Sequence, residues 1–280
     1  MQSFIMKMRG GSSMYSYGLR IVFLLCLVLT PQISLGQQFS LPGFGSDRFF
    51  QSDRNQPNGF HKVIDPLTSE GKKKVFEFSV VPRPCFKADC EQQSARSTVQ
   101  QYHASQPTEA WYGWDMYFPE DFPYGPKQVS GFNIYNEWKE QDDCMLAGLT
   151  NFGGAAEPRT GQPDMQLSWR MANANLPGDC PMILKEPIAN FKDLLGRWSR
   201  FEVFIRWSKE KDGNVLIYMD GKLKLNYKGE TCFSDCNKNM YYLFGHYICC
   251  TANTKEIVAS KVYYRNVSRS KTRDGLKWLD

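Results

Sequence analysis

Three consecutive strand patterns between residues 196 and 227 constrain the fold of this chain more than any other feature. In Phe201–Trp207, Asn214–Met219 and Leu223–Tyr227, β-branched and aromatic residues alternate with polar ones, as expected for strands with one buried face. The dipeptides Asp212-Gly213 and Asp220-Gly221 separate the runs, and both are typical of tight turns between antiparallel strands. The segment therefore predicts an antiparallel meander.

Similar patterns recur along the rest of the chain, each short and bounded by Pro, Gly, Asn or Asp. They predict further strands at Lys74–Val80, Ser97–Tyr102, Ala110–Phe118, Gly131–Trp138, Met165–Met171, Met240–Tyr247 and Ser260–Val267. Only Ile188–Leu195 has a helical pattern, which extends over about one turn. This arrangement predicts an all-β fold, a two-sheet antiparallel β-sandwich or jelly roll, in which the concave sheet often carries a long groove.

Residues 1–36 have the pattern of a signal peptide. Lys7, Arg9 and Arg20 form a basic leader, Ile21–Leu29 is apolar, and Ser34-Leu35-Gly36 offers small residues for cleavage. A single membrane anchor is the alternative, but the apolar run is much shorter than the roughly 20 residues that span a bilayer. We therefore expect a secreted protein, extracellular or periplasmic, that begins near Gln37 and has no membrane span after processing.

The mature chain is expected to form one domain. Residues 37–58 are rich in Gln, Gly, Pro, Asn and Ser and predict an extended N-terminal arm, and residues 59–280 fit a single β-jelly-roll domain. Loss of the signal peptide removes three basic residues and no acidic one, so the formal net charge falls from +5 to +2. A chain of such low charge without a dense Lys/Arg stripe is a poor candidate for binding nucleic acid. We expect a monomer.

Eight cysteines remain after the signal peptide, which in an exported chain favours up to four disulfides. The spacing of Cys85 and Cys90 suits a local loop closure. The adjacent Cys249 and Cys250 must reach two different partners, and one interpretation pairs them with Cys232 and Cys236. The alternative is a zinc site of four thiolates formed by the residues Cys232, Cys236, Cys249 and Cys250.

Several motifs resemble those of secreted polysaccharide lyases of the heparin-lyase-I-like group. The meander resembles their Gly-x-Trp-His, Trp-Ser, Asp-Gly and Asp-Gly-Lys segments, and Trp111–Phe122, Arg96–Val99 and Tyr241–Tyr247 resemble further motifs in the same order. Together the matches span residues 96–267. The resemblance implies a concanavalin A-like jelly roll, a lyase activity that degrades an acidic polysaccharide, and no required cofactor. It leaves a structural calcium ion open and identifies no metal ligands.

The chain departs from this group at three positions. The group's Gln-x-His pair falls on Glu137 and Lys139, its Glu after the arginine falls on Thr98, and its Lys in the tyrosine motif falls on Leu243. The fold therefore follows from the resemblance more directly than the activity does.

The reaction that the resemblance implies removes the proton from C5 of a uronate and then expels the 4-linked sugar. It needs a neutralised carboxylate, a base and an acid. Tyr247 is the expected acid and a candidate base if a cation lowers its pKa, and Arg96 is the expected carboxylate partner. Lys139 is a candidate base or charge clamp. Glu137 would repel a uronate unless it is protonated, paired with Lys139 or bound to a cation.

Other candidates follow from strand alternation. His246 and His103 are further candidates, because a histidine side chain ordinarily titrates near neutral pH. His246 should point to the opposite face from its neighbour Tyr247 unless a bulge intervenes. Alternation also places Gln166, Ser168 and Arg170 on one face, opposite the core-facing residues Met165, Leu167, Trp169 and Met171. Gln166 and Arg170 are therefore candidate substrate-binding residues. Asn136, next to Glu137, is a third.

Two other functions remain open. A glycoside hydrolase needs two carboxylates flanking the scissile bond. The acids Glu137, Glu140, Asp142 and Asp143 are present but lack the alternation expected of sandwich hydrolases. A non-catalytic glycan-binding protein could have kept the groove and lost the chemistry. Substitution of Arg96 or Tyr247 would distinguish them, because it should abolish turnover in a lyase but only weaken binding in a lectin-like protein.

Overall fold

The computed structural model describes residues 38–52, 56–68, 73–82, 94–102, 106–124, 132–140, 145–151, 165–172, 182–232, 236, 240–249 and 257–278. These residues belong to the unit Leu35–Asp280. The expected signal peptide, residues 1–36, lies outside them. Within the described ranges no helix is long and apolar enough to cross a membrane.

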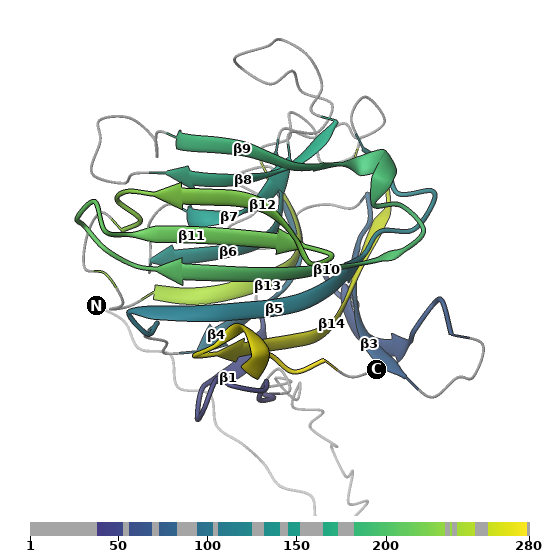
Figure 1. Ribbon diagram of the computed structural model, residues 1–280. Helices are drawn as coiled ribbons and strands as arrows, with labels where there is room; N and C mark the ends of the chain where they lie inside the picture. Colours follow the sequence, from purple (N-terminus) through teal and green to yellow (C-terminus); the bar gives the residue numbers. More distant parts are fainter. Residues whose placement is uncertain are drawn as a thin grey trace, which may run out of the picture. The chain divides into compact units, whose positions relative to one another are not determined.

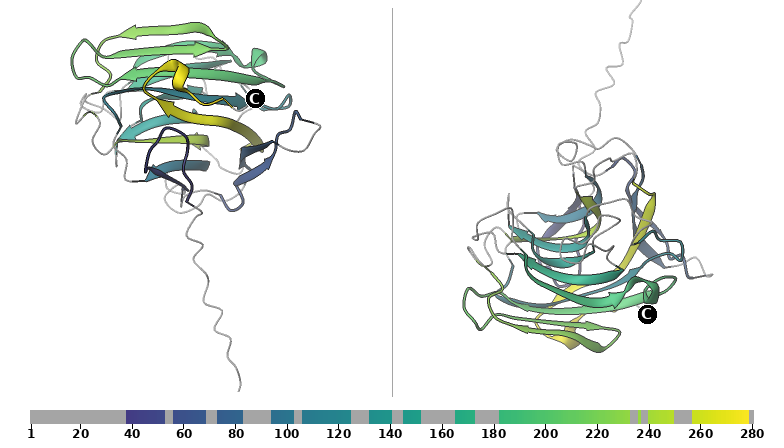
Figure 2. Two further views of the ribbon diagram at one scale, coloured as in Figure 1. Left: turned by 60° about the horizontal axis from the view of Figure 1, so that its bottom comes forward. Right: turned by 90° about the horizontal axis from the view of Figure 1, so that it is seen from above.

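The domain is a sandwich of two antiparallel seven-stranded sheets (Figures 1 and 2). Sheet A contains, in spatial order, β1 (Arg48–Gln51), β4 (Ala95–Tyr102), β13 (Met240–Cys249), β6 (Phe132–Glu140), β7 (Met145–Asn151), β8 (Gln166–Ala172) and β9 (Met182–Asn190). Sheet B contains β12 (Lys222–Lys228), β11 (Asn214–Met219), β10 (Trp198–Arg206), β5 (Glu109–Tyr117), β14 (Ser260–Ser270), β3 (Lys74–Val80) and β2 (Phe60–Ile64). The predicted all-β sandwich is confirmed.

The core lies between the sheets and is rich in aromatic residues. Trp114 from sheet B and Trp138 and Trp169 from sheet A are fully buried. The ring of Trp138 has its centroid 4.9 Å from that of Tyr112 and 5.7 Å from that of Trp169. Because each aromatic side chain buries about 150–250 Å², these contacts hold the sheets together. We call the face of each sheet that looks away from this core its outer face.

The predicted meander is β10, β11 and β12. At the turn between β11 and β12, Asp220 and Gly221 have φ angles of 50° and 75°, the left-handed conformation that a two-residue turn requires. The Asp220 carboxylate accepts hydrogen bonds from the backbone N of Arg200 and from both Nη atoms of Arg197, each at 2.9 Å. These bonds anchor the turn to the start of β10.

Four strands were not predicted, and three of them are sheet edges: β1, β2 and β9. An edge strand has only one neighbour and often carries little apolar pattern. β1 falls within the expected arm, residues 37–58, and pairs with β4. The fourth, β7, is buried on both faces and so lacks alternation. The helical expectation for Ile188–Leu195 is wrong over its first three residues, which end β9; only Phe191–Asp193 form a 3-10 turn, η3.

The disulfide prediction for the C-terminal cysteines also needs correction. Cys232 and Cys236 form a disulfide with each other. They therefore cannot be the partners of Cys249 and Cys250, and a zinc site that uses all four thiolates is excluded in this oxidised state. The predicted closure between Cys85 and Cys90 lies outside the described residues.

Candidate active site

Polar side chains from four strands gather on the outer face of sheet A. Successive side chains of a strand point to opposite faces, and the core contains Val99 on β4, Tyr242 on β13, Trp138 on β6 and Trp169 on β8. The neighbouring positions therefore lie on the outer face. We call this set the site face: Arg96, Thr98, Glu137, Lys139, Ser168, Arg170 and Tyr247.

Arg96 and Tyr247 are in direct contact on the site face. They lie directly opposite each other in the β4–β13 ladder. The guanidinium carbon of Arg96 is 4.0 Å from the centroid of the Tyr247 ring, a cation–π contact, and both residues are buried. The structure thus joins two candidates that are 151 positions apart in the sequence.

A bulge in β13 sets the position of Tyr247. The register between β13 and β6 shifts between Phe244 and Tyr247, so that Leu243 opposes Glu137 while Tyr247 opposes Ile134. Gly245 within the bulge has a φ of 142°, and a Cβ there would lie 2.3 Å from the carbonyl oxygen of Ser97. Only glycine fits this approach of β13 to β4.

Glu137 is the buried carboxylate of the site face, with 4% of its surface exposed. Burial raises the pKa of its carboxyl group above the ordinary value, although the positive charges of Lys139 and Arg96 oppose the shift. Lys139 is half-buried and lies two residues along the same strand. Glu137 therefore holds its proton to a higher pH than an exposed glutamate.

Gly148 separates Glu137 from Arg170 across three strands. Glu137 opposes Gly148 in the β6–β7 ladder, and Gly148 opposes Arg170 in the β7–β8 ladder. A Cβ on Gly148 would lie 2.2 Å from the carbonyl oxygen of Asn136, so no larger residue fits. Consequently β7 places no side chain between the glutamate and the arginine on the outer face.

His246 lies in the core, as its alternation with Tyr247 predicted, and it cannot act on the outer face as a catalytic residue. Its ring centroid is 5.7 Å from that of Tyr135 and 5.7 Å from that of Phe122. Its Nδ1 atom is 3.5 Å from the Ser260 hydroxyl. Burial lowers the pKa of His246 to about 3, so the ring is neutral in ordinary conditions.

The structure also places Asn136, an expected substrate-binding residue, in the core and not on the site face. Its side chain is fully buried, and its Nδ2 atom donates a hydrogen bond of 3.2 Å to the Tyr242 hydroxyl in the core. Asn136 alternates with Glu137, so it lies on the interior face with Trp138. Tyr135 is the extra residue of a bulge in β6 and is interior as well. His103 lies outside the described residues.

The polar face predicted for β8 is present. Leu167, Trp169 and Met171 are in the core, which leaves Ser168 and Arg170 on the outer face together with Gln166 at the start of the strand. Gln166 lies near the edge, with its Nε2 atom 3.5 Å from the Asn190 Oδ1 atom. Met165, expected in the core, is 44% exposed because it precedes the strand.

Sequence reasoning placed the Ser168 hydroxyl on this face but missed that of Thr150. Thr150 on β7 opposes Ser168 on β8. Both hydroxyl oxygens are buried and have no hydrogen-bond partner among the described residues. Buried hydroxyls normally bond to protein, water or ligand, so this pair is suited to a polar ligand. No local pattern marks Thr150, because β7 is buried on both faces.

Within the described part of the chain, no three His, Cys, Asp or Glu side chains are close enough to hold a metal ion. The site face itself offers a phenol, a carboxyl group and cationic side chains. Such a set can bind a carboxylate and move a proton.

The chain belongs to the polysaccharide lyase family, whose sequence pattern matches residues 50–268. Among solved structures it is similar to an endo-β-1,4-glucuronan lyase from the fungus Trichoderma reesei, with a TM-score of 0.60 and 16% identity over 87% of this chain and 97% of that one. An alginate lyase from Klebsiella pneumoniae matches with a TM-score of 0.51 and 10% identity over 79% and 86%. These likenesses show a shared fold. No curated protein gave a significant match.

Proposed function

We propose that this lyase cleaves a uronic-acid-containing glycan by β-elimination on the outer face of sheet A. The observation that carries the proposal is the Arg96–Tyr247 pair beside the buried Glu137. The two similar structures are named as lyases of glucuronan and of alginate, both uronate polymers. Glucuronan is the first substrate to test, because the glucuronan lyase aligns with the larger share of this chain.

Arg96 and Glu137 would neutralise the substrate carboxylate. The planar fork of Arg96 suits bidentate pairing with a carboxylate. Glu137, whose pKa is raised by burial, would donate its proton in a hydrogen bond to the same group and would not repel it. Withdrawal of charge from the carboxylate acidifies the proton on C5, which is the difficult step of the reaction.

Tyr247 would move the proton. The C5–H bond breaks as the phenolate oxygen takes the proton, a double bond forms between C4 and C5, and the C4–O bond breaks. The same hydroxyl then protonates the departing oxygen, so that the proton is conserved within the site. Arg96 over the ring supplies the cation that this role requires. Lys139 is the alternative base on the same face.

Arg170, Gln166 and the hydroxyl pair of Thr150 and Ser168 would bind sugars on one side of the cleaved bond, because β7 and β8 lie on the same side of β4 and β13. Arg170 lies across Gly148 from Glu137, at about 9–10 Å by the spacing of two strands. This is about the length of two sugar residues. The glycan would therefore run across the strands of sheet A.

We also infer that the chain belongs to the heparin-lyase-I-like group, from the motifs of residues 96–267. We infer that it is exported, from the pattern of residues 1–36. The Cys232–Cys236 disulfide is compatible with an oxidising compartment. We expect a monomer without a required cofactor.

The test is incubation of the exported, disulfide-intact protein with glucuronan, alginate, heparin-type chains and pectate. A rise in ultraviolet absorbance from a 4,5-unsaturated product on one polymer, lost in the Tyr247→Phe variant, is the expected result. New reducing ends without such absorbance would indicate hydrolysis. Retention of a glycan on the protein without any cleavage would indicate a binding protein whose departures at Glu137 and Leu243 have removed the chemistry.

A further inference from the structure

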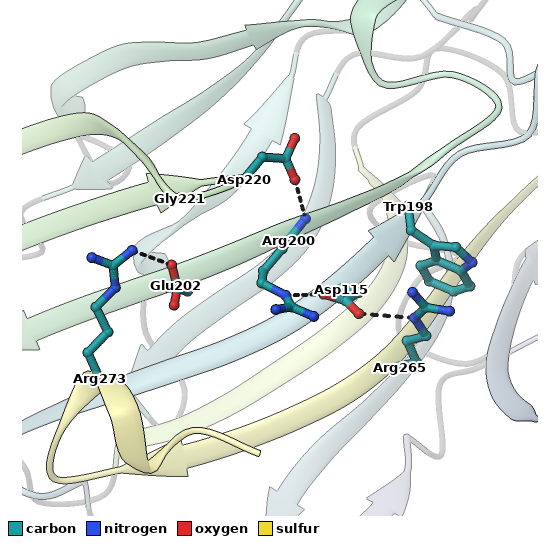
Figure 3. A pocket seen from close by; sticks show the side chains of 8 residues that line it. All are labelled: Asp115, Trp198, Arg200, Glu202, Asp220, Gly221, Arg265 and Arg273. Carbon is teal, nitrogen blue, oxygen red and sulfur yellow. Dashed lines mark hydrogen bonds and ion pairs between the residues drawn. The ribbon is translucent and has the colours of Figure 1, made fainter. Parts of the chain in front are cut away.

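A hollow of about 500 Å³ lies on the outer face of sheet B, on the other side of the sandwich from the site face (Figure 3). It is open to solvent and combines arginine, carboxylate and tryptophan side chains. Its lining residues are Asp115, Trp198, Arg200, Glu202, Asp220, Gly221, Arg265 and Arg273. None of them belongs to the candidate active site.

Two arginines of the hollow share one buried carboxylate. Asp115 on β5 opposes Arg200 on β10 and Arg265 on β14. Its Oδ1 atom accepts from the Arg200 Nε at 3.2 Å, and its Oδ2 atom accepts from the Arg265 Nε at 3.0 Å (Figure 3). Arg265 also donates from Nη1 to Asp65 at 2.8 Å. These bonds hold each guanidinium group in place through the nitrogen atoms that face the carboxylates.

Each arginine of the hollow also stacks on an aromatic ring. The guanidinium carbon of Arg265 is 4.3 Å from the Trp198 ring, that of Arg200 is 4.0 Å from the Trp278 ring, and that of Arg273 is 3.7 Å from the Tyr218 ring. Cation–π stacking holds the planar groups in one orientation. The arginines are therefore preorganised, and a ligand would not have to order them.

The C-terminal segment forms one wall of the hollow. It crosses β5 at Gly113, where a Cβ would lie 2.8 Å from the Trp278 ring. Leu276 is buried there, and the backbone N of Lys277 donates to the Ser268 hydroxyl at 3.2 Å. The absence of a side chain at Gly113 thus lets the segment bring Arg273 to the hollow and place the Trp278 ring against Arg200.

The exposed side chains of the hollow are two arginines and one aspartate. The Asp115 side chain is 3% exposed and that of Glu202 11%, whereas those of Arg200, Asp220 and Arg273 are 39%, 34% and 33% exposed. The Asp220 carboxylate is already bonded to Arg197 and to the backbone N of Arg200. Within the described residues, no hydrogen bond uses Nη1 or Nη2 of Arg200, Nη2 of Arg265, or Nε and Nη1 of Arg273. Three arginines and three carboxylates leave no net formal charge, so recognition here depends on directed N–H groups.

We propose that this hollow is a second glycan-binding site, in which Arg200 and Arg273 bind the carboxylate of a uronate residue and Trp198 contacts the sugar ring. The arginine fork pairs bidentately with a carboxylate, and the half-buried tryptophan offers apolar surface to the sugar. The choice of a uronate as the ligand rests on the proposed function. The positions of the hydrogen-bond donors do not depend on it. The site holds polymer away from the reacting bond, so it affects long chains and leaves short oligosaccharides unaffected.

The first test needs no variant of the hollow. Hydroxyl-radical footprinting of the Tyr247→Phe protein with and without glucuronate hexasaccharide should show protection of Trp198 and Trp278. Tyr227, half-buried on β12 and outside the hollow, should stay equally reactive and serves as the internal control. Alginate oligosaccharide and neutral cellohexaose are the comparison ligands. If Trp198 stays unprotected at a saturating concentration of the uronate oligosaccharide, the proposal is overturned.

The second test measures affinity by electrophoresis in gels that contain glucuronan or alginate. The double variant Arg200→Gln with Arg273→Gln should lose about tenfold in affinity for the polymer. Its turnover of a uronate trisaccharide should stay within about twofold of the parent. The matched control is Arg206→Gln on the same strand, which removes the exposed pair with Glu109 at 2.7 Å and should change neither value. Equal losses in the double variant and the control overturn the proposal.

The two proposals fail in different ways. Protection of Trp198 without cleavage of any uronate polymer would refute the proposed function and leave the second site standing. Cleavage of a uronate polymer without protection of Trp198 would refute the second site and leave the proposed function standing. Protection by cellohexaose equal to that by the uronate would refute carboxylate recognition at the hollow.

Discussion

Two buried glutamates, one on the outer face of each sheet, show how differently the sandwich uses the same side chain. Glu77 on β3 of sheet B accepts hydrogen bonds from Ser79 at 2.9 Å and Lys261 at 3.1 Å. Burial raises its pKa, but hydrogen bonds from Lys261, Tyr263 and Ser79 outweigh burial, and the net pKa is lowered. Glu137 on β6 of sheet A has a raised pKa, because Lys139 and Arg96 do not compensate for its burial.

The same contrast extends to the two outer faces. On sheet B the carboxylate of Asp115 is bonded to arginines of both neighbouring strands, and that of Glu202 is bonded to Arg273, which follows β14. Both carboxylates are therefore satisfied without a ligand, although several N–H groups of the arginines are not within the described part of the chain. On sheet A the cations Arg96 and Lys139 leave Glu137 with a raised pKa, and two buried hydroxyls have no partner among the described residues. A carboxylate that is satisfied by its neighbours stabilises a fold, whereas a carboxyl group with a raised pKa is available for proton chemistry.

The largest expected effect is on turnover after the change Tyr247→Phe. Loss of the phenol hydroxyl removes the group that transfers the proton, so kcat should fall by about 10²–10⁴-fold with little change in affinity. Product absorbance on the preferred uronate polymer measures the first quantity and gel retardation the second. Tyr263→Phe on sheet B is the control. An equal fall in kcat for both variants would contradict the assignment of catalysis to sheet A.

The second prediction tests whether Glu137 works in its protonated form. Glu137→Ala removes a hydrogen-bond donor to the substrate carboxylate and should lower kcat by about 100-fold. Glu137→Gln keeps a neutral donor of the same shape and should retain activity within about tenfold, with the fall of activity at high pH moved upward or abolished. A pH–rate profile from pH 5 to 9 measures both. Loss in the glutamine variant as deep as in the alanine variant would show that the ionised form is needed.

The third prediction concerns stability on sheet B. Asp115→Asn removes the charge that Arg200 and Arg265 share, so the free energy of unfolding should fall by about 3 kcal/mol. Turnover of a short uronate oligosaccharide below the unfolding temperature should stay unchanged. Denaturant titration measures the free energy of unfolding, and the product assay measures turnover. A loss of turnover larger than the loss of folded protein would place Asp115 in the catalytic machinery.

The smallest expected effects concern folding stability, to which the two glutamates contribute with opposite dependences on pH. Because the pKa of Glu77 is lowered on folding, its contribution is present above the ordinary glutamate pKa and is lost as the pH falls through the folded value. Because the pKa of Glu137 is raised, stability falls as the pH rises from the ordinary value toward the folded one.

These signs predict how two glutamine variants differ from the parent protein. Glu77→Gln should cost about 2 kcal/mol at pH 7 and less near pH 3. Glu137→Gln should gain stability relative to the parent as the pH rises from 4 to 8. Urea unfolding at several pH values measures both curves. Parallel curves for the two variants would remove the contrast between the faces.

Much of the fold could be predicted from local pattern, and the exceptions have a common cause. The strands at Lys74–Val80 and Asn214–Met219 have the predicted bounds, because one face is buried and alternation is strong. The edge strand β9 carries Pro187 and several polar residues, and its end was mistaken for a helix. Of the candidate site residues, alternation correctly separated His246 from Tyr247, and it also separates Asn136 from Glu137. The β6 bulge that turns Tyr135 inward was not visible in the sequence.

The sequence by itself determined the class of fold, the family, and the side of each strong strand on which a residue lies, because alternation and turn residues act over a few positions. Only the tertiary structure decided which strands are neighbours. That choice brings Arg96 beside Tyr247, leaves Gly148 between Glu137 and Arg170, pairs Cys232 with Cys236, and joins Asp115 to two arginines. Register and burial depend on groups contributed by distant strands, so the pKa of Glu137 and the hollow on sheet B arise only when the sheets are assembled.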